Sequence, residues 1–359
     1  MNTEVIFANA FNHIDTVGPR ALAHLREHFG SYETAWRSGN SNFISALRNI
    51  SDADDIAQRR AAIDPTVAYR HVEELDIALL LENDPVFPPR LREVTPAVAC
   101  LYVQGALPDW NTPSLAVVGT RMPTTYGREA CRSLVGPIAA SGISIISGLA
   151  VGIDTEAHKA CLSQKGKTIA VLGSGIARDS LYPAVNKHLA DQIVAEGGAI
   201  VSEYPPCRKA TQWTFPQRNR IIAGLANAVL VVEAKQKSGA RITASLALEL
   251  GRDVLAVPGS IFSANSWTPH ALIRDGAVPV TTADDIYQAL GILSPGGTQT
   301  GAEELPEAQA VLDCLAEPMS ANDIARSARE DISTILRTLA LLEIHGKVRN
   351  IGNGIYRRI

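Results

Sequence analysis

Basic and aromatic side chains alternate without a single acid in residues 206–220, which read PCRKATQWTFPQRNR. No Asp or Glu occurs between Glu203 and Glu233, although the whole chain has a net charge of −4. Cationic side chains pair with phosphates, and aromatic rings stack on unpaired bases. The segment therefore predicts a local polyanion site; the alternative is a surface loop whose aromatics fill the core and whose cations are only solvated. The residues concerned are Arg208, Lys209, Arg218, Arg220, Trp213, Phe215 and the nearby Tyr204.

Four glycine-bearing turns each follow a short apolar run directly. Glycine lets the backbone approach a ligand closely, and a helix that begins after such a turn adds partial positive charge at its first amides. Tight strand-to-helix turns also need glycine for steric reasons alone, so one such turn is weak support. Four of them at one edge of a sheet, beside the basic segment, favour an anionic ligand. The turns are Gly119-Thr120-Arg121, Ser147-Gly148-Leu149-Ala150, Gly173-Ser174-Gly175 and Pro258-Gly259-Ser260.

The common nucleotide fingerprints are absent from these turns. None has the spacing GxGxxG or GxxxxGK[ST], so ATP hydrolysis is not expected. Asp154 and His158 stand four residues apart at a predicted helix start, and Glu203 and Glu233 follow strands, so an acid-base pair is conceivable. The simpler interpretation makes Asp154 a helix N-cap and His158 a packed residue. We find no nucleophile-base constellation and expect no catalysis, metal or cofactor.

Short apolar strands alternate with helices over the middle of the chain. This pattern predicts an α/β fold with a Rossmann-like, doubly wound parallel sheet covered on both faces. Ligands of such sheets bind at the carboxyl ends of the strands, where the four turns lie. The predicted strands are 115–118, 143–146, 168–172, 199–201, 229–232 and 254–257, and the predicted helices are 126–140, 155–164, 187–195 and 243–250.

Helical segments flank this core on both sides. Residues 1–68 predict a small helical domain, similar to SAM or helix-hairpin-helix domains, in which Val17-Gly18-Pro19-Arg20 separates two amphipathic helices; packing explains that turn better than phosphate binding. We assign 69–292 to the core and the Gly/Ser/Thr-rich stretch 293–303 to a linker. Residues 304–359 predict three helices and a hairpin, hence a winged helix. Its third helix, 332–344, follows Glu330-Asp331, and residues 303–359 carry seven Lys/Arg against nine Asp/Glu, which disfavours duplex readout.

Composition sets broad limits. A chain of 359 residues with 46% hydrophobic content is long enough for two or three domains. No apolar run approaches the roughly 20 residues of a membrane span, so we expect a cytoplasmic protein. The five cysteines are scattered and form no CxxC pair, which indicates reduced thiols rather than a zinc site or disulfides. A pI near 6.1 confines any nucleic-acid site to a local cleft.

The motifs taken together resemble those of the DprA/Smf family of DNA-processing proteins, over residues from about 83 to 290. The helical N-terminal domain and the winged-helix tail also resemble parts found in longer family members. The motifs that carry the resemblance are Val118-Gly119-Thr120-Arg121, Ser147-Gly148-Leu149-Ala150 continuing to Ala157-His158, Tyr182-Pro183, Ser202-Glu203-Tyr204, Phe215-Pro216, Arg218-Asn219-Arg220, Val232-Glu233-Ala234, Ser238-Gly239 and Val257-Pro258-Gly259-Ser260.

The resemblance implies a non-catalytic protein of natural transformation that binds and protects incoming single-stranded DNA, helps load RecA recombinase and acts as a homodimer. It carries DNA contacts onto Arg121 and onto Arg218, Asn219 and Arg220. The full set of expected DNA-binding residues is Gly119, Thr120, Arg121, Ser147, Gly148, Gly173, Ser174, Gly175, Lys187, Trp213, Phe215, Arg218, Asn219, Arg220, Lys235, Ser238 and Gly239.

Two positions depart from the family pattern. Many relatives have a DNA-contacting lysine after Tyr-Pro, where this chain has Ala184, and Lys187 is the expected substitute. The region before the last core helix reads Ser266-Trp267-Thr268-Pro269-His270 instead of a glycine-rich loop. The resemblance assigns dimerisation to this region, so the expected interface residues are Trp267, His270, Leu272 and Ile273. For Trp267 the alternative is a role in the core.

Two other functions compete with the single-strand mediator. The core also resembles nucleoside-phosphate phosphoribohydrolases, but residues 238–243, SGARIT, lack the paired glycines of their PGGxGTxxE segment, and the first acid beyond is Glu249. A winged-helix transcription regulator would need duplex readout by residues 332–344, which the acidic start of that helix disfavours. We therefore predict a single-stranded DNA-binding protein, with a nucleotide-processing enzyme as the alternative.

Overall fold

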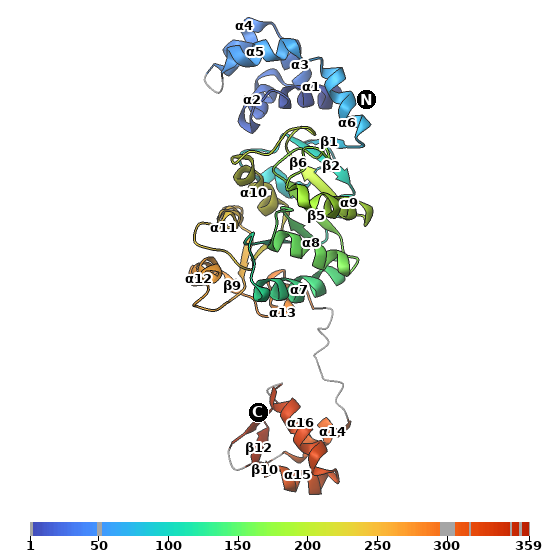
Figure 1. The fold of residues 1–359 in the computed structure, drawn as a ribbon, viewed down its shortest axis with the longest axis vertical. Helices are drawn as coiled ribbons and strands as arrows, with labels where there is room; N and C mark the ends of the chain where they lie inside the picture. The colour runs from blue at the N-terminus through green and yellow to red at the C-terminus, as the bar shows by residue number, and fades with distance from the viewer. Residues whose placement is uncertain are drawn as a thin grey trace. The chain divides into compact units, whose positions relative to one another are not determined.

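The computed structural model describes residues 3–48, 52–294, 306–315, 317–344, 347–351 and 354–358. The chain forms two compact units, Met1–Ile292 and Leu293–Ile359 (Figure 1). Among the described residues, no helix has the length and apolar character that a bilayer crossing requires.

The first unit is built on a nine-stranded sheet in its described part, with the order β1-β2-β6-β5-β4-β3-β7-β8-β9. The strands from β3 to β9 pair in parallel, whereas β1 pairs with β2 and β2 pairs with β6 antiparallel. The strands are β1 (Ala78–Leu81), β2 (Cys100–Gly105), β3 (Ser114–Val118), β4 (Ser144–Ser147), β5 (Thr168–Leu172), β6 (Ala199–Ser202), β7 (Ala228–Val231), β8 (Asp253–Ala256) and β9 (Val278–Pro279).

The predicted α/β fold with a parallel sheet core is confirmed, and the sheet extends beyond the predicted strands. The six predicted strands pair in parallel with one another, and β1 and β2, which were not predicted, add an antiparallel edge. These two strands are joined by the long Pro-containing passage 82–99, which holds a short 3-10 helix (Pro89–Glu93) but no α-helix, so the alternation of strands and helices gave no sign of them. The six strands predicted from the sequence all occur, within one residue at each end.

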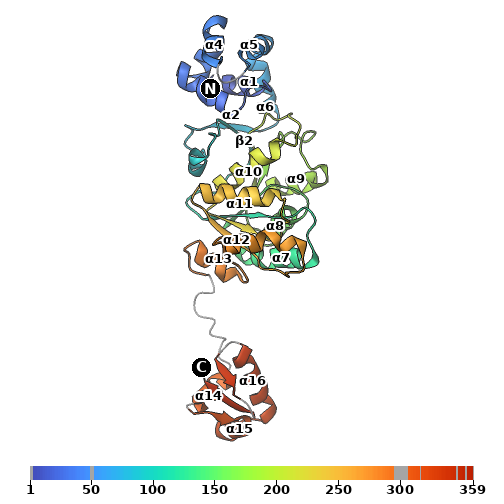
Figure 2. The same cartoon turned by 90° about the vertical axis from the view of Figure 1, so that its left-hand side faces the viewer.

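Helices cover both faces of the parallel part (Figures 1 and 2). Alternating residues of β3 divide the core: Leu115 and Val117 pack with α7 and α8, whereas Ala116 and Val118 pack with α10 and α11. The helices of the core are α7 (Thr125–Ala140), α8 (Ile153–Ser163), α9 (Lys187–Ala195), α10 (Thr214–Leu225), α11 (Gly239–Glu249), α12 (Trp267–Arg274) and α13 (Ala283–Ala289).

The N-terminal helices share a hydrophobic core with the sheet instead of forming a separate one. Phe11, Tyr32 and Phe43 belong to the same buried cluster as Tyr102 of β2 and Leu172 of β5. Polar contacts join the two parts as well, since the Tyr102 hydroxyl donates to Asn9 Oδ1 at 2.8 Å and Asn12 Nδ2 donates to the Glu203 carbonyl at 2.9 Å. These helices are α1 (Thr3–Asn12), α2 (Pro19–Phe29), α3 (Tyr32–Arg37), α4 (Asn40–Leu47), α5 (Ala53–Ala62) and α6 (Pro65–Glu74), the last of which extends past residue 68.

The second unit contains the three helices and the hairpin strands expected of a winged helix. Ser320 caps the second helix, as predicted, by accepting a hydrogen bond from the Asp323 amide at 3.2 Å. Residues 352–353 of the predicted hairpin turn lie outside the described residues. The elements are α14 (Pro306–Cys314), β10 (Met319–Ser320), α15 (Ala321–Ala328), α16 (Ile332–Ile344), β11 (Val348–Asn350) and β12 (Ile355–Arg358).

Candidate nucleic-acid interface

A cavity of about 660 Å³ opens at the carboxyl ends of the parallel strands, between α10 and α11. Its position matches the strand edge where the sequence predicts a ligand site. The cavity is lined by the turns after β3 and β4, the first half of α10 and the segment leading into α11. Its lining comprises Val118, Gly119, Thr120, Arg121, Met122, Ala150, Asp154, Gln212, Phe215, Pro216, Arg218, Asn219, Ile222, Lys235, Lys237, Ser238, Gly239, Ala240, Ile242 and Thr243.

Arg121 is the exposed cation of the turn after β3. The backbone of this turn is held on both sides, because the Thr120 amide donates to the Glu233 carbonyl at 2.6 Å and the Thr120 carbonyl accepts from the Ile153 amide at 3.1 Å. The Arg121 guanidinium carbon lies 5.5 Å from the centre of the Phe215 ring, a cation–π contact. A fixed backbone and an aromatic support keep this charge at the cavity.

Phe215 forms the aromatic wall. Its ring centre lies 5.5 Å from that of Tyr182, with the planes tilted by 51°. A side chain on Gly173 would place its Cβ 2.9 Å from Phe215 Cδ1, so glycine at this position makes room for the ring. Gly173 therefore positions Phe215 and does not line the cavity itself.

Arg218 lies at the floor of the cavity, and its side chain is buried. Its Nη1 donates to the Gly148 carbonyl at 2.6 Å and to the Val171 carbonyl, and its Nε donates to Asn219 Oδ1 at 3.2 Å. Burial lowers the pKa of Arg218 to about 10, and the nearby Asp154 carboxylate opposes this shift. Arg218 therefore remains protonated at neutral pH and places a buried positive charge at the floor of the cavity.

Asp154 is the one acid among the cavity-lining residues. The predicted N-cap role was wrong: Gly152 is the N-cap of α8, and Asp154 is the second residue of the helix. Its Oδ2 instead accepts from the amides of Gly148 at 3.1 Å and Ala150 at 3.4 Å. Burial raises the pKa of this carboxyl group, while Arg218 and the two amides act in the opposite direction. Asp154 thus holds the turn after β4 together.

The segment leading into α11 supplies further positive charge. Lys235 and Lys237 are exposed, and neither forms an ion pair with a described residue. Ser238 caps α11 by accepting from the Ala240 amide at 3.3 Å, and Asn219 Nδ2 donates to the Gly239 carbonyl at 3.2 Å. Lys237 was not among the predicted residues, because it lies beyond Glu233, in a second acid-free run of residues 234–248. Gln212 and Met122 were missed as well, because neither residue type signals an anion site.

The structure brings about half of the predicted DNA-binding residues together. The members of this set that line the cavity are Gly119, Thr120, Arg121, Phe215, Arg218, Asn219, Lys235, Ser238 and Gly239. Ser147 and Ser174 are fully buried, and their hydroxyl groups donate hydrogen bonds to backbone carbonyls. Gly148 lies behind Arg218, and Gly175 packs on the backbone of Pro206. Lys187 lines a different hollow with Arg178 and Asp191, and Trp213, 70% exposed, lies outside the lining.

Arg220 does not line the cavity. Its Nη2 donates to Glu203 Oε1, and both side chains are almost fully buried. The prediction that Tyr204 offers a face to a base is corrected too, because this ring is buried and its hydroxyl donates to Gln217 at 2.9 Å. The reason is secondary structure: residues from Thr214 onward form α10, and a helix turns successive cations in different directions. The basic segment is therefore neither one continuous patch nor one loop.

Glu233 belongs to the scaffold. Its carboxylate accepts from the Thr124 amide at 2.9 Å, from the Thr124 hydroxyl at 2.7 Å and from Asn265 Nδ2 at 3.3 Å. These contacts anchor the N-terminal end of α7. Glu233 is buried and does not line the cavity.

The residues expected at a dimer interface lie on α12, with unequal exposure. Trp267 is 40% exposed, Leu272 is buried, and Ile273 is partly buried against the core. His270 Nε2 lies 3.0 Å from the Gly259 carbonyl. Leu272 therefore contributes to folding rather than to a surface, and the interface stays a prediction for the other three.

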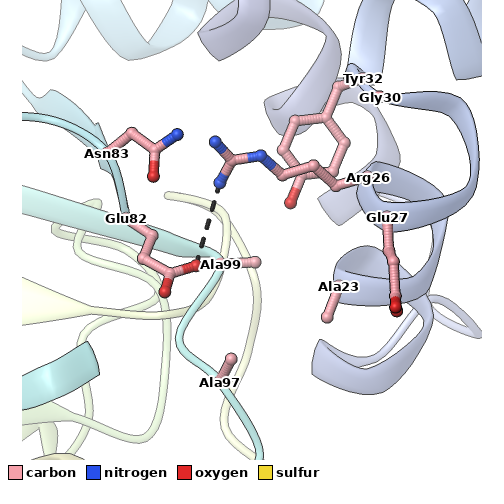
Figure 3. Close-up of a pocket in the computed structure, with 9 residues that line it drawn as sticks. All are labelled: Ala23, Arg26, Glu27, Gly30, Tyr32, Glu82, Asn83, Ala97 and Ala99. Atoms are coloured by element: carbon pink, nitrogen blue, oxygen red, sulfur yellow. Dashed lines mark ion pairs between the residues drawn. The ribbon is translucent and has the colours of Figure 1, made fainter. Parts of the chain in front are cut away.

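A second hollow, of about 390 Å³, lies between α2 and the end of β1 (Figure 3). Its one cation, Arg26, faces Glu82 at 3.9 Å, and Glu27 also lines the hollow. Two carboxylates beside one guanidinium do not favour a polyanion. The cavity between α10 and α11 is the better candidate for a nucleic-acid site.

Comparison with known proteins identifies the family of this chain. Residues 78–291 match the family profile of DNA recombination-mediator protein A. The chain belongs to the DprA/Smf family. Residues 297–354 match the DprA winged helix domain. The DprA/Smf relative Protein Smf of Synechocystis is 37% identical over 298 residues, which cover 81% of this chain and 74% of that protein.

Two solved DprA structures share the fold. DNA processing protein A from Streptococcus pneumoniae superposes with a TM-score of 0.67 at 33% identity, covering 78% of this chain and 97% of that one. The protein from Helicobacter pylori, solved to study its single-stranded DNA binding mode, superposes with a TM-score of 0.52 at 27% identity, covering 60% of this chain and 95% of that one. Family membership thus extends over the core that forms the cavity.

Proposed function

We propose that this DNA-processing protein binds single-stranded DNA in the cavity between α10 and α11. The observation that carries the proposal is the pairing of Arg121 with Phe215, an exposed guanidinium 5.5 Å from the centre of an aromatic ring. The site is edged by Lys235 and Lys237, which form no ion pair within the described part of the chain. The H. pylori relative, which binds single-stranded DNA, supports the same ligand.

Each part of the cavity has a distinct task in this proposal. Arg121, Lys235 and Lys237 neutralise backbone phosphates, which makes binding salt-dependent. Phe215 stacks on a base, and stacking is tolerant of sequence because every base has a π-face. Arg218 and Asp154 hold the turn after β4 in place and do not touch the strand directly. Duplex DNA binds less well because its bases are not free to reach Phe215.

We propose binding without catalysis. The single acid of the lining, Asp154, is occupied by two backbone amides, so it is not free to act as a general base on a bound nucleotide. Protection of DNA, loading of RecA recombinase, a homodimeric state and a cytoplasmic location follow from the family resemblance and stay predictions.

The experiment is fluorescence anisotropy of labelled single-stranded and duplex oligonucleotides over a series of salt concentrations. We expect single strands to bind more tightly, and we expect Arg121→Ala to weaken that binding at least tenfold, since the contact is charge-assisted. Arg48→Ala, which removes an exposed arginine at the end of α4 instead, serves as the matched control and leaves affinity unchanged. Equal affinity of the Arg121→Ala variant and the wild type would refute the site. Release of free base from AMP at an enzymatic rate would favour the nucleotide-processing alternative.

A further inference from the structure

A separate depression, of about 470 Å³, lies over the first turns of α11 and shares lining residues with the cavity. Lys237, Ser238, Gly239 and Ile242 line both. The depression extends past them to Gln236, Arg241 and Ser245. The two depressions therefore form one continuous path that leaves the cavity over α11.

The far end of this path repeats the chemistry of the cavity. The Arg241 guanidinium carbon lies 5.4 Å from the ring centre of Trp267, the first residue of α12, just as Arg121 lies 5.5 Å from Phe215. Arg241 is exposed, and Trp267 is 40% exposed. A guanidinium that rests on an aromatic face keeps its N–H edge free for a phosphate. Figure 2 shows α11 and α12 next to each other, which is how residues 26 positions apart in the sequence come into contact.

The charge of the path suits a nucleic-acid backbone throughout. Residues 234–248 contain no acid, and their three cations line the two depressions: Lys235 the cavity, Lys237 both, and Arg241 the far one. None of the three forms an ion pair with a described residue. An apolar partner surface would leave these cations desolvated and unpaired, which is unfavourable.

We propose that Arg241 and Trp267 form a second subsite, on which a bound single strand continues after it leaves the cavity over α11. This inference rests on the proposed function, and for Trp267 it replaces the dimer-interface role that the family resemblance implies. Lys237, which lines both depressions, connects the two subsites. Short strands occupy the cavity alone, whereas longer strands reach Arg241 and Trp267 as well.

The test compares oligothymidylates of about 6 and about 20 nucleotides by anisotropy, since single-strand sites commonly span several nucleotides. Arg241→Glu is expected to weaken binding of the longer strand about tenfold and of the shorter strand less than about twofold. Arg121→Ala weakens both. Trp267→Ala lowers affinity for the longer strand, and Trp267→Phe, which keeps a stacking face, restores most of it.

The outcomes are distinguishable. Unchanged affinity of Arg241→Glu for the longer strand, or an equal loss for both strands, overturns the second subsite and leaves the cavity intact as a site. Sedimentation of the variants decides between DNA and a second copy of the chain as the partner of this surface. If Arg241→Glu changes the oligomeric state, and the loss of affinity for the longer strand is no greater than the loss of oligomer explains, the surface is an interface between copies and the proposal fails. Failure of the wild type to bind either strand overturns the proposed function itself. Thermal unfolding of each variant establishes whether a loss of affinity arises from misfolding.

Discussion

The Arg218 guanidinium group occupies the space that a side chain on Gly148 would need. Nη1 donates to the Gly148 carbonyl at 2.6 Å, and a Cβ on Gly148 would meet Nη2 at the same separation of 2.6 Å, far inside a normal contact. The glycine of the turn after β4 is thus matched to the arginine of α10, and Arg218 forms the floor of the cavity in front of Gly148.

Substitution of Gly148 by alanine is expected to destabilise the protein by about 1–3 kcal/mol, because the buried guanidinium has no room to retreat. Chemical denaturation measures the loss. Gly136→Ala is the matched control: Gly136 lies inside α7, where the nearest atom to an added Cβ is Gln164 Cγ at 4.0 Å, so this change is expected to be neutral or stabilising. Equal stability of both variants would contradict the matched packing of Gly148 and Arg218.

Removal of the aromatic wall is expected to reduce affinity without changing the salt dependence. Phe215→Ala loses a stacking face worth about 1–3 kcal/mol per base, whereas Arg121→Ala also lowers the slope of log affinity against log salt by about 0.7. Anisotropy over a salt series separates the two effects. A changed slope in Phe215→Ala would mean that the ring acts only by positioning Arg121.

The buried pair of Arg220 and Glu203 predicts a loss of stability rather than of DNA contact. Arg220→Ala leaves the Glu203 carboxylate buried without its partner, which costs about 3–5 kcal/mol. The double variant Arg220→Met with Glu203→Gln is expected to recover most of that loss, because it removes both charges. The folded double variant keeps wild-type affinity for single strands; a tenfold weaker affinity would return Arg220 to the DNA site.

His158 predicts a fall in stability below neutral pH. Thr168 donates its hydroxyl proton to the Ile145 carbonyl at 2.8 Å, so it accepts from His158 Nδ1 at 2.7 Å, and Nε2 is buried without a partner among the described residues. Burial lowers the pKa of His158 to about 3, from an ordinary value of 6.5. Between these values the unfolded chain binds the proton and the folded chain does not, so this group removes about 1.4 kcal/mol of stability per pH unit as the pH falls below 6.5.

The measurement compares denaturation midpoints of the wild type and His158→Gln at several pH values between 5 and 7. Over this range His158 titrates in the unfolded chain but stays neutral in the folded chain. The variant is expected to lose that part of the pH dependence, whatever its absolute stability. Parallel curves for the two proteins would mean that His158 is accessible to protons in the folded state.

The winged-helix unit is expected to be dispensable for single-strand binding. All cavity residues lie within the unit Met1–Ile292, so a fragment of residues 1–294 keeps the affinity of the full chain within about twofold. Two apolar residues, Ile332 and Leu336, are exposed one turn apart on α16, which suits a protein contact better than duplex readout. A large drop in affinity of the fragment would assign DNA binding to the tail.

The sequence by itself determined the α/β core, the order of its parallel strands and helices along the chain, and the edge where a ligand would lie. Those features depend on local periodicity, which can be read directly from the sequence, and on the general rule that the turns after parallel strands meet at one edge of the sheet. It also singled out Arg121, because an arginine in a glycine turn after a strand is exposed by the turn itself.

Only the tertiary structure decided which cations face a ligand. Arg218 and Arg220 are two residues apart and look equivalent in the sequence, but α10 turns one toward the cavity floor and the other into an ion pair with Glu203. Whether a charged side chain points outward depends on what packs against its helix, and the partners here, Gly148 and Glu203, are 70 and 17 positions away. The same holds for Arg241 and Trp267. They are 26 positions apart in the sequence and come into contact because α11 lies beside α12.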